Sequence, residues 1–281
     1  MKSFAPPDPL LVATDVARAL SEDIGSGDAT ASLLPAERRA SASVTAKESA
    51  TLAGRDWFDA CFAALDATSR VTWAARDGDQ VSAGSIICSI EGHARALVSA
   101  ERSALNFLQT LSGTATTTAA YVRAVAGTRA TILDTRKTIP GLRLAQKYAV
   151  RCGGGSNHRI GLYDAVLIKE NHIAAAGTIA TAVSRARAAS PGLLLEVEVE
   201  TLAQLEEALA AQPDRILIDD FTLADMRIAV ARAAGACPLE VSGGVSLETI
   251  RAIADTGVDF ISVGALTKHV RAVDLSMRVS A

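Results

Sequence analysis

The chain has 281 residues, 49% hydrophobic and 21% charged, with a formal net charge of −3 at pH 7 and a pI of about 5.9. This length can bury a substantial core in one large domain or two smaller ones. The composition is typical of a soluble globular protein. It shows neither the charge excess of a nucleic-acid or membrane surface nor an apolar run of the roughly 18 residues that span a bilayer.

The cysteines indicate a reducing compartment. The chain has four of them, Cys61, Cys88, Cys152 and Cys237, with no CxxC pair and no histidine at metal-ligand spacing. We therefore expect buried free thiols. The first residues, MKSFAPPDP, contain no apolar segment of a secretion signal. A cytoplasmic location is expected.

The first part of the chain mixes helices and short strands. Apolar residues recur with helical spacing from Leu10 to Leu20, and Ser43 to Leu52 alternates as a strand does. Val71 to Ile90 predicts two or three short strands with turns at Asp-Gly and Gly. From Ala94 to Ala126 the pattern is helical again, and Gly113 predicts a break or two separate helices.

After Gly127 apolar strands alternate with amphipathic helices. The strands are TILDT, AVLIKE, LLLEVEVE, RILIDD, LEVSGG and FISVGA. This alternation predicts a parallel sheet, and the polar or glycine residues that end every strand favour an α/β barrel over an open sheet with one switch point. Six clear strands are fewer than eight, so the barrel is expected to be incomplete, with its site at the carboxyl ends of the strands.

Five cationic or potentially cationic side chains lie at the edges of apolar runs in this region. They are Arg136, Lys137, His158, Arg159 and Lys169. Each alone is also typical of a solvated surface or a turn, and no GxxxxGK loop is present. A lysine that ends an apolar strand, as Lys169 does, loses solvation unless it faces an anion. Together, at one end of neighbouring strands, these residues predict a pocket for an anion with several charges.

Carboxylates end two of the same strands. In LLLEVEVE the strand period puts Glu196, Glu198 and Glu200 on one face, and Asp219 ends RILIDD. Three like charges on one face repel, so a metal ion or the basic residues must compensate them. The alternative is a face open to solvent.

Glycines follow the last two strands, in VSGGVS and SVGAL. Glycine lets the backbone approach a ligand, and a helix that follows presents free N–H groups to phosphate. Barrels often hold a phosphate with their last loops. The alternative is a pair of tight turns.

These blocks resemble one family. SEDIGSGDAT, ERSALNFLQTLSGTAT, DTRKTIPGLR, GGGSNHRIGLYDAVLIKENH, EVEVE and VSGGV are similar to the quinolinate phosphoribosyltransferase family (nicotinate-nucleotide pyrophosphorylase, decarboxylating). The resemblance runs from about residue 10 to residue 279. Asp220 departs from the asparagine that is common in the family at that position.

The resemblance implies an N-terminal α/β sandwich domain over residues 1–112. Residues 113–281 then form an incomplete, six- to seven-stranded α/β barrel, with a last helix that can pack back on the first domain. It also implies a cytoplasmic homodimer. This pentosyltransferase of de novo NAD biosynthesis converts quinolinate and 5-phosphoribosyl 1-diphosphate to nicotinate mononucleotide, CO2 and diphosphate with Mg2+.

The resemblance also implies roles for individual residues. Arg102 enters the partner subunit's active site and helps to bind quinolinate. The substrate pocket is lined by Thr135, Arg136, Lys137, His158, Arg159, Lys169, Glu198 and Asp219, of which Lys137, Lys169, Glu198 and Asp219 are catalytic candidates. Glu198 and Asp219 face the ribose and Mg2+, which is held mainly through the substrate diphosphate. Phosphate is held by Ser242, Gly243, Gly244, Val263, Gly264 and Ala265.

Three alternatives remain open at this stage. The first is a related phosphoribosyl- or ribosyl-transferring enzyme with another aromatic acceptor. The second is a barrel aldolase that uses Lys169 as a Schiff-base amine, although an aldolase needs neither the carboxylates nor so many arginines. The third is a non-catalytic protein that binds a small anion.

Overall fold

The computed structural model describes residues 5–280 and divides the chain into two compact units. One unit holds the described residues up to Ala119, the segment Thr138–Gly154 and the described residues from His269 onward. The other holds Ala120–Lys137 and Gly155–Lys268. The long helix α3 (Ala94–Ala124) passes from the first unit into the second.

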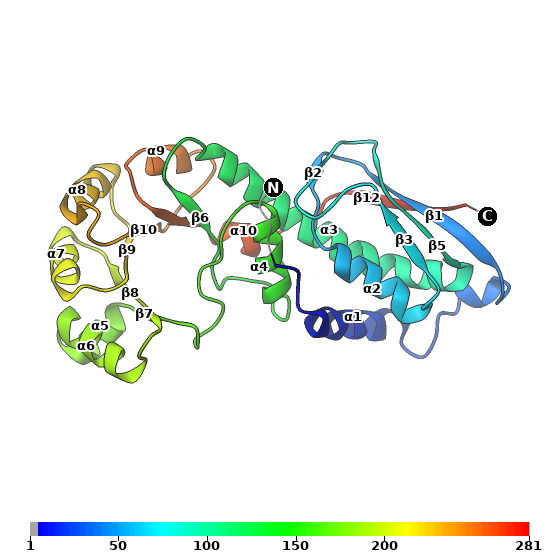
Figure 1. Ribbon diagram of the computed structural model, residues 1–281, viewed down its shortest axis with the longest axis horizontal. Coiled ribbons are helices and arrows are strands. Elements are labelled where there is room, and N and C mark those ends of the chain that lie inside the picture. Colours follow the sequence, from blue (N-terminus) through cyan, green and yellow to red (C-terminus); the bar gives the residue numbers. More distant parts are fainter. Residues whose placement is uncertain (1–4, 281) are drawn as a thin grey trace. The chain divides into compact units, whose positions relative to one another are not determined.

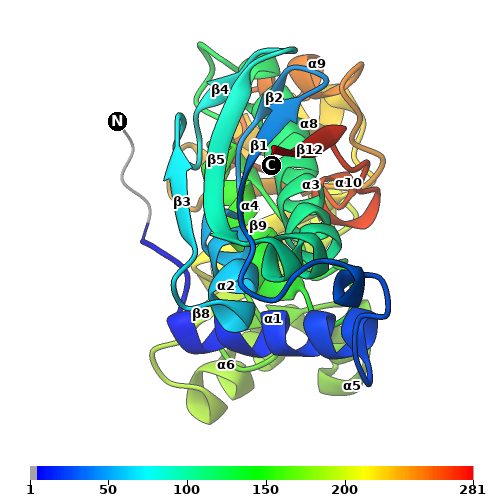
Figure 2. The same cartoon turned by 90° about the vertical axis from the view of Figure 1, so that its right-hand side faces the viewer.

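The first unit is a layer of helices on an antiparallel sheet. The sheet has the order β12-β1-β5-β3, and α1, α2 and α3 lie on one of its faces (Figures 1 and 2). The remaining elements are α1 Pro9–Ile24, a 3-10 turn Ala31–Leu33, β1 Arg39–Ala46, β2 Ala50–Thr51, α2 Arg55–Leu65, β3 Arg70–Trp73, β4 Gln80–Val81, β5 Ile86–His93, α4 Arg143–Cys152 and β12 Leu275–Ser280. The short strands β2 and β4 pair separately.

Local sequence explains how this unit begins and where its core lies. Asp8 caps α1 by accepting a hydrogen bond from the Leu10 N–H at 2.9 Å, and proline occupies the first turn, where its missing N–H does no harm. The aromatic residues of α2, Trp57 and Phe58 among them, are fully buried in the hydrophobic core of this unit. The Trp57 Nε1–H donates to the buried Asp15 at 3.0 Å, so the polar end of the ring is satisfied.

Gly113 does not break the long helix, contrary to the expectation from sequence. Helix α3 runs without interruption from Ala94 to Ala124. A methyl group at Gly113 would overlap the carbonyl oxygen of Arg271, which passes close to the helix. The glycine is therefore needed for the close approach of a second chain segment.

The last part of the chain also differs from expectation. After the short helix α10 (Ala265–Lys268), the chain ends in strand β12 within the described residues, not in a last helix. Strand β12 pairs antiparallel with β1, with Met277 opposite Val44 and Leu275 opposite Ala46. The segment thus returns to the first unit as an edge strand of its sheet.

Asp66, at the end of α2, is the acceptor of several hydrogen bonds. Its carboxylate accepts hydrogen bonds from Thr68, Ser69 and His93, including both the backbone N–H and the Nδ1 atom of His93. The side-chain hydrogen bond from Thr68, followed by that from the His93 backbone, lowers the pKa of Asp66 below its ordinary value. The ionised carboxylate therefore stabilises this corner of the unit.

We expect Asp66→Ala to lower the free energy of unfolding by about 2 kcal/mol at pH 7, because several partly buried hydrogen bonds lose a charged acceptor. Since the folded-state pKa is lowered, the stabilisation is full above the unfolded pKa of about 4 and declines as the pH falls below it. Urea unfolding at pH 7 and at lower pH measures both effects. Glu91→Ala, on the exposed side of β5, should change stability by less than about 0.5 kcal/mol. An equal loss in both variants would contradict the role of Asp66.

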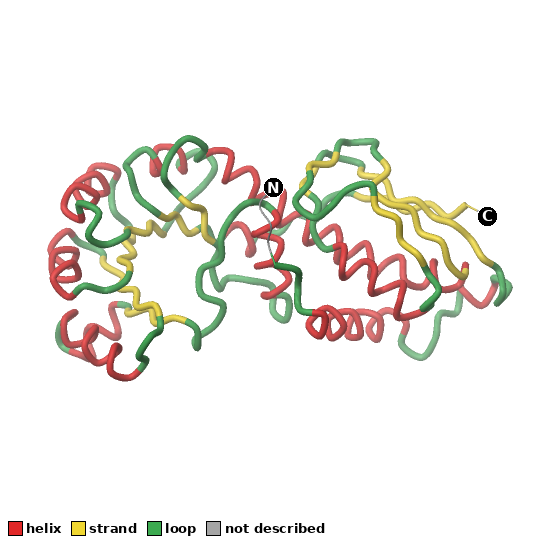
Figure 3. Tube along the Cα trace, viewed as in Figure 1, coloured by secondary structure: helices red, strands yellow, loops and turns green. Residues whose placement is uncertain are grey.

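The second unit is an incomplete α/β barrel, as predicted. Its parallel sheet has six strands in the order β6-β11-β10-β9-β8-β7, which follow an arc with helices on the outside (Figure 3). The elements are β6 Thr131–Leu133, β7 Ala165–Ile168, α5 Glu170–Ala176, α6 Ile179–Ala189, β8 Leu194–Val199, α7 Leu202–Ala211, β9 Arg215–Asp219, α8 Leu223–Ala233, β10 Leu239–Ser242, α9 Ile250–Ala254, β11 Phe260–Ser262 and α10 Ala265–Lys268. All six strands predicted from sequence are present.

Threonine begins three of these helices. Thr178, Thr201 and Thr222 each accept a hydrogen bond from a backbone N–H in the first turn of α6, α7 and α8. Thr201 and Thr222 follow β8 and β9 closely, so these two strand-to-helix connections are short, whereas Thr178 separates α5 from α6. Within the described part of the chain, no helix combines the length and the apolarity needed to cross a bilayer.

Candidate active site

The predicted site residues, apart from Arg102, all belong to the second unit. Most lie at the carboxyl ends of its strands or directly after them, and His158 and Arg159 follow Ser156, which bridges to Leu133 at the end of β6. Thr135, Arg136 and Lys137 follow β6, and His158 and Arg159 precede β7. Lys169 follows β7, and Glu198 and Asp219 lie near the ends of β8 and β9. Ser242 ends β10 and Gly243 and Gly244 follow it, while Val263, Gly264 and Ala265 follow β11.

Asp134 joins the two basic segments. This fully buried carboxylate accepts hydrogen bonds from the His158 backbone N–H at 2.9 Å and from the Asn157 Nδ2 atom at 2.6 Å. Ser156 also bridges to β6, with its N–H 2.8 Å from the Ile132 carbonyl oxygen. The residues after β6 and the residues around His158 are thus held side by side, which the sequence did not reveal.

The arginines of these two segments lie close enough to repel. Burial, and after it the positive charge of Arg136, lowers the pKa of Arg159 below its ordinary value. An anion bound between the two guanidinium groups would relieve this repulsion. The geometry therefore suits a ligand with more than one negative charge.

Lys169 and Glu198 form an ion pair inside the barrel. The Lys169 Nζ atom lies 2.5 Å from the Glu198 Oε2 atom, and the side chains are 43% and 9% exposed. The Lys169 amine therefore donates to a carboxylate. This contact disfavours the aldolase alternative, because a Schiff-base lysine must react as a neutral amine.

Asp219 lies near the same pair. Burial raises the pKa of Asp219, and the negative charges of Glu198 and Asp220 raise it further, while Lys169 and Lys137 oppose the rise. Asp220 has a positive φ of 55°, a conformation that Asn and Asp adopt more readily than most residues. The carboxylates of Glu198, Asp219 and Asp220 thus lie near two lysines, Lys137 and Lys169, at this end of the barrel.

The exposure of the β8 side chains shows whether its glutamates face solvent. Glu196 and Glu198 are 1% and 9% exposed, so the solvent-facing alternative is wrong for both, while Glu200 is exposed. Val197 and Val199 are buried as well, as expected for a parallel strand covered on both faces. Lys169 supplies the compensating charge for Glu198, whereas Glu196 is held by a hydrogen bond, its Oε2 atom lying 2.9 Å from the His158 Nε2 atom.

Two interior residues were not identified from sequence. Glu240 of β10 is fully buried and pairs with Arg215 of β9 at 2.8 Å, and Arg215 stacks over the Phe260 ring at 4.1 Å. Burial raises the pKa of Glu240 to about 7, and the neighbouring Glu196 contributes. A glutamate within the short apolar strand LEVS was the available signal.

His158, Glu196 and Glu240 have potential metal-ligand atoms within 4.8 Å of one another, but the ring does not suit a metal. The His158 Nδ1 atom accepts the Arg159 N–H at 2.7 Å, so the proton of the neutral ring must lie on Nε2. Burial lowers the pKa of His158, and the Glu196 and Glu240 carboxylates outweigh it and raise the pKa. The hydrogen bond at Nδ1 requires a lone pair, so we assign the neutral tautomer with Nε2–H directed at Glu196.

The glycine loops after β10 and β11 lie against Asp219 and Lys137. A methyl at Gly243 would lie 2.9 Å from the Asp219 Oδ1 atom, and one at Gly264 would lie 3.2 Å from the Lys137 Cδ atom. Gly243 also has a φ of 89°. Helix α10 begins directly after Gly264, as predicted, whereas α9 begins only at Ile250, so a loop separates Gly244 from it.

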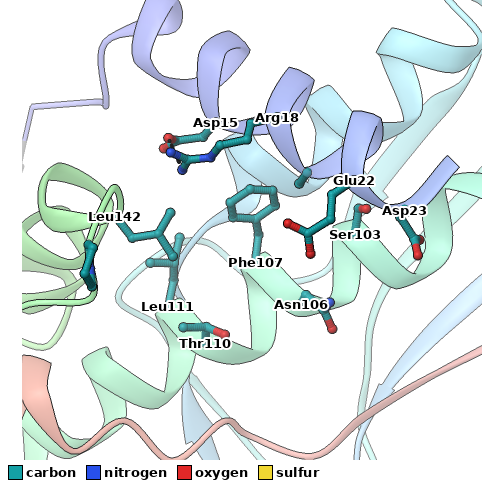
Figure 4. A pocket seen from close by; sticks show the side chains of 12 residues that line it. Asp15, Arg18, Glu22, Asp23, Ser103, Asn106, Phe107, Thr110, Leu111 and Leu142 are labelled. Atoms are coloured by element: carbon teal, nitrogen blue, oxygen red, sulfur yellow. Dashed lines mark hydrogen bonds and ion pairs between the residues drawn. The ribbon is translucent and has the colours of Figure 1, made fainter. Parts of the chain in front are cut away.

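Arg102 belongs to α3 in the first unit, where it is exposed. Near it, between α1 and α3, this unit has a cavity of about 470 Å³ (Figure 4). Asp15, Arg18, Glu22 and Asp23 line one side, and Ser103, Asn106, Phe107 and Thr110 line the other. With three carboxylates and one guanidinium, this cavity does not resemble an anion pocket.

Basic loops over interior carboxylates, at the open end of a partial barrel, define an α/β-barrel enzyme for anionic, phosphorylated ligands. The chain matches the family model "Quinolinate phosphoribosyl transferase, N-terminal domain" over residues 28–112 and the C-terminal domain model over residues 114–278. The chain belongs to the quinolinate phosphoribosyl transferase family, and the resemblance seen in its motifs is confirmed.

Individual relatives agree along nearly the whole length. The nicotinate-nucleotide pyrophosphorylase [carboxylating] of Mycobacterium leprae (strain TN) is 44% identical over 272 residues, which cover 93% of this chain and 95% of that one. A probable enzyme of the same name from Bacillus subtilis (strain 168) is 43% identical, covering 92% and 90%. The solved structure of the nicotinate-nucleotide pyrophosphorylase from Francisella tularensis is 46% identical, covers all of both chains and superposes with a TM-score of 0.96.

Proposed function

We propose that this protein is a quinolinate phosphoribosyltransferase of NAD biosynthesis. It transfers the phosphoribosyl group of 5-phosphoribosyl 1-diphosphate to quinolinate and releases nicotinate mononucleotide, CO2 and diphosphate. The observation that carries the proposal is the group of basic residues held over buried carboxylates in a chain of this family. The names of its relatives support the same reaction.

The basic segments explain the choice of a dicarboxylate. Arg136 and Arg159 repel each other, and the two carboxylates of quinolinate can each engage one guanidinium fork. Thr135, Lys137 and His158 complete the wall of this pocket. A monocarboxylate would engage only one of the two guanidinium groups.

The interior carboxylates suit the ribose. As diphosphate leaves, positive charge develops at the anomeric carbon, and Glu198 and Asp219 can stabilise it or hold the ribose hydroxyls. The pyridine nitrogen then attacks that carbon, a step that depends on positioning more than on proton transfer. Lys169, fixed by Glu198, is placed beside this region.

Mg2+ fits the chemistry of these donors. Glu198 and Asp219 offer carboxylate oxygens of the kind that Mg2+ binds, and a divalent cation would relieve part of the burial and like charge that raise the pKa of Asp219. Since Mg2+ usually keeps waters and substrate phosphates as ligands, it would be held mainly through the substrate diphosphate. When bound, it neutralises charge on the leaving diphosphate.

The remaining groups complete the reaction. Ser242, Gly243, Gly244, Val263, Gly264 and Ala265 form the phosphate site, where glycine lets the backbone approach the anion. The Val263 N–H itself donates to the Leu133 carbonyl oxygen at 2.9 Å, so Val263 shapes the loop and does not contact phosphate through that group. After transfer, the bond to the carboxylate beside the ring nitrogen breaks, CO2 leaves, and the electron pair on the ring carbon is stabilised by the pyridinium. A proton from Lys137 or Lys169 then restores the ring C–H bond.

The assembly and location form part of the proposal. We infer a homodimer in which Arg102 of one subunit enters the pocket of its partner, because Arg102 is exposed on α3 and adds a cation for quinolinate. We place the enzyme in the cytoplasm. The four cysteines are free and buried, as is common in a reducing compartment.

We expect the purified protein, with 5-phosphoribosyl 1-diphosphate and Mg2+, to release CO2 and diphosphate from quinolinate. Nicotinate should turn over with a kcat/KM roughly tenfold to over a hundredfold lower, because one charge-assisted contact worth about 1.5–3 kcal/mol is lost. Diphosphate release with each acceptor, and 14CO2 release from labelled quinolinate, measure this. Equal turnover of nicotinate would favour a related transferase, and no diphosphate release with either acceptor would favour an anion-binding protein.

A further inference from the structure

A buried polar network lies beneath the substrate pocket. It consists of Glu196, His158, Glu240 and Arg215, which come from β8, the loop before β7, β10 and β9. None of the reaction steps above uses Glu196, Glu240 or Arg215. Glu196 and Glu240 are 1% and 0% exposed, so their charges are kept away from water.

Such a network is expensive to keep in a core. Burying several ionisable groups costs desolvation free energy that their attraction seldom exceeds, and well-packed apolar residues often stabilise a core as well or better. Neighbouring interior positions of the same sheet carry apolar residues, such as Leu217 of β9. A role for the network beyond stability is therefore indicated.

The network fixes both nitrogens of the His158 ring. The Nε2 atom lies 2.9 Å from the Glu196 Oε2 atom and 3.4 Å from the Glu240 Oε1 atom. The Nδ1 atom accepts the backbone N–H of Arg159 at 2.7 Å. The ring thus connects two interior carboxylates to the backbone of the residue that follows it.

The Glu240 side of the network is held in place by further contacts. Arg215 donates to the Glu240 Oε2 atom at 2.8 Å and is held by its stacking on Phe260. Glu240 therefore cannot turn away from His158 without breaking the Arg215 contact. On the other side, the His158 backbone N–H is held by Asp134 at 2.9 Å.

We propose that Glu196 and Glu240 are positioning residues for the acceptor site: through the His158 ring they hold the backbone of Arg159 and so orient its guanidinium for a carboxylate of the acceptor. This inference rests on the proposed function, because it assigns the acceptor carboxylate to Arg159. Glu196 accepts the hydrogen bond from the Nε2–H and so fixes the orientation of the ring. Glu240, whose Oε1 atom lies 3.4 Å from the same nitrogen, limits its movement.

Variants of Glu196 distinguish a positioning role from a purely electrostatic role and from a role in folding alone. In Glu196→Gln the amide oxygen can still accept the Nε2–H, while in Glu196→Ala the acceptor is lost. If Glu196 acted only through its negative charge, it would repel quinolinate. Both Glu196→Gln and Glu196→Ala remove that charge, so both variants would then bind quinolinate more tightly. A carboxylate needed only for folding would affect both substrates alike.

We expect Glu196→Ala to raise the KM for quinolinate about tenfold or more, as for loss of one hydrogen bond in a positioned group, with the KM for 5-phosphoribosyl 1-diphosphate changed less than about twofold. Glu196→Gln should restore the quinolinate KM to within about threefold of the wild type. Glu200→Ala, an exposed glutamate after the same strand, is the matched control and should resemble the wild type. Thermal unfolding of each variant verifies that it is folded.

Calorimetric titration of quinolinate and of 5-phosphoribosyl 1-diphosphate gives a second readout. If Glu196→Ala fails to fold, Glu240→Gln replaces it as the test variant. The glutamine side chain has nearly the same size as glutamate, but without the charge it binds Arg215 less strongly. A selective loss of quinolinate affinity is again expected. Unchanged or tighter quinolinate binding in the folded Ala variant, or parallel losses for both substrates, would overturn the proposal. Failure of the wild type to bind quinolinate would instead overturn the proposed function.

Discussion

Arg102→Ala and Lys137→Ala should each be inactive alone, and a mixture of the two should regain about a quarter of wild-type activity. Arg102 lies on α3 of the first unit, and Lys137 lies in the barrel unit. In the proposed dimer a mixed pair of subunits contains one pocket in which both residues are intact. Random exchange makes about half of the dimers mixed, each with one good pocket of two, if the pockets act independently.

The measurement is diphosphate release after the two variants have been mixed, unfolded and refolded together to exchange subunits. The control is a mixture of Lys137→Ala with Lys169→Ala. Both residues belong to the same barrel pocket, so no mixed dimer contains an intact one and no activity should return. If exchange is demonstrated with tagged subunits and the Arg102 mixture stays inactive, Arg102 does not complete a partner's pocket.

Arg136→Ala should weaken quinolinate binding by about tenfold to over a hundredfold, equivalent to about 1.5–3 kcal/mol for one charge-assisted contact. Binding of 5-phosphoribosyl 1-diphosphate should change far less. The structure supports the assignment because Arg136 and Arg159 are close enough for the charge of one to lower the pKa of the other.

Separate calorimetric titrations of the two ligands measure this selectivity. Arg187→Ala is a suitable control in the same unit, since Arg187 pairs with Asp214 at 2.8 Å where β9 begins, at the opposite end of the strands. It should leave both affinities unchanged. Parallel losses for both ligands in Arg136→Ala would show that Arg136 does not select the acceptor.

The strands of the barrel could be predicted because their signal is local. A parallel strand covered on both faces is an apolar run, and the polar residues that end it mark the edge where ligands bind. The same logic placed Lys169, Glu198 and Asp219 at one edge, and the structure shows Lys169 in contact with Glu198.

The features that were missed depend on segments distant in sequence. Gly113 has a poor helix propensity, and only the passage of Arg271 beside it explains why the helix continues through it. Strand β12 was not recognised because its partner β1 lies at the other end of the chain. Glu240 became part of a network only when β9 and β10 brought it to Arg215 and His158.

The pairing of β12 with β1 has a consequence for biosynthesis. β1 is among the first strands to leave the ribosome, and β12 among the last, so at about 5–20 residues per second β1 waits on the order of tens of seconds for its neighbour. During that time the backbone groups of residues 41–46 that face β12 in the folded protein are available for pairing with another chain, since only the other edge of β1 pairs with β5. A nascent chain stalled before Leu275 would keep that edge open, and such chains are where aggregation or chaperone binding should be concentrated.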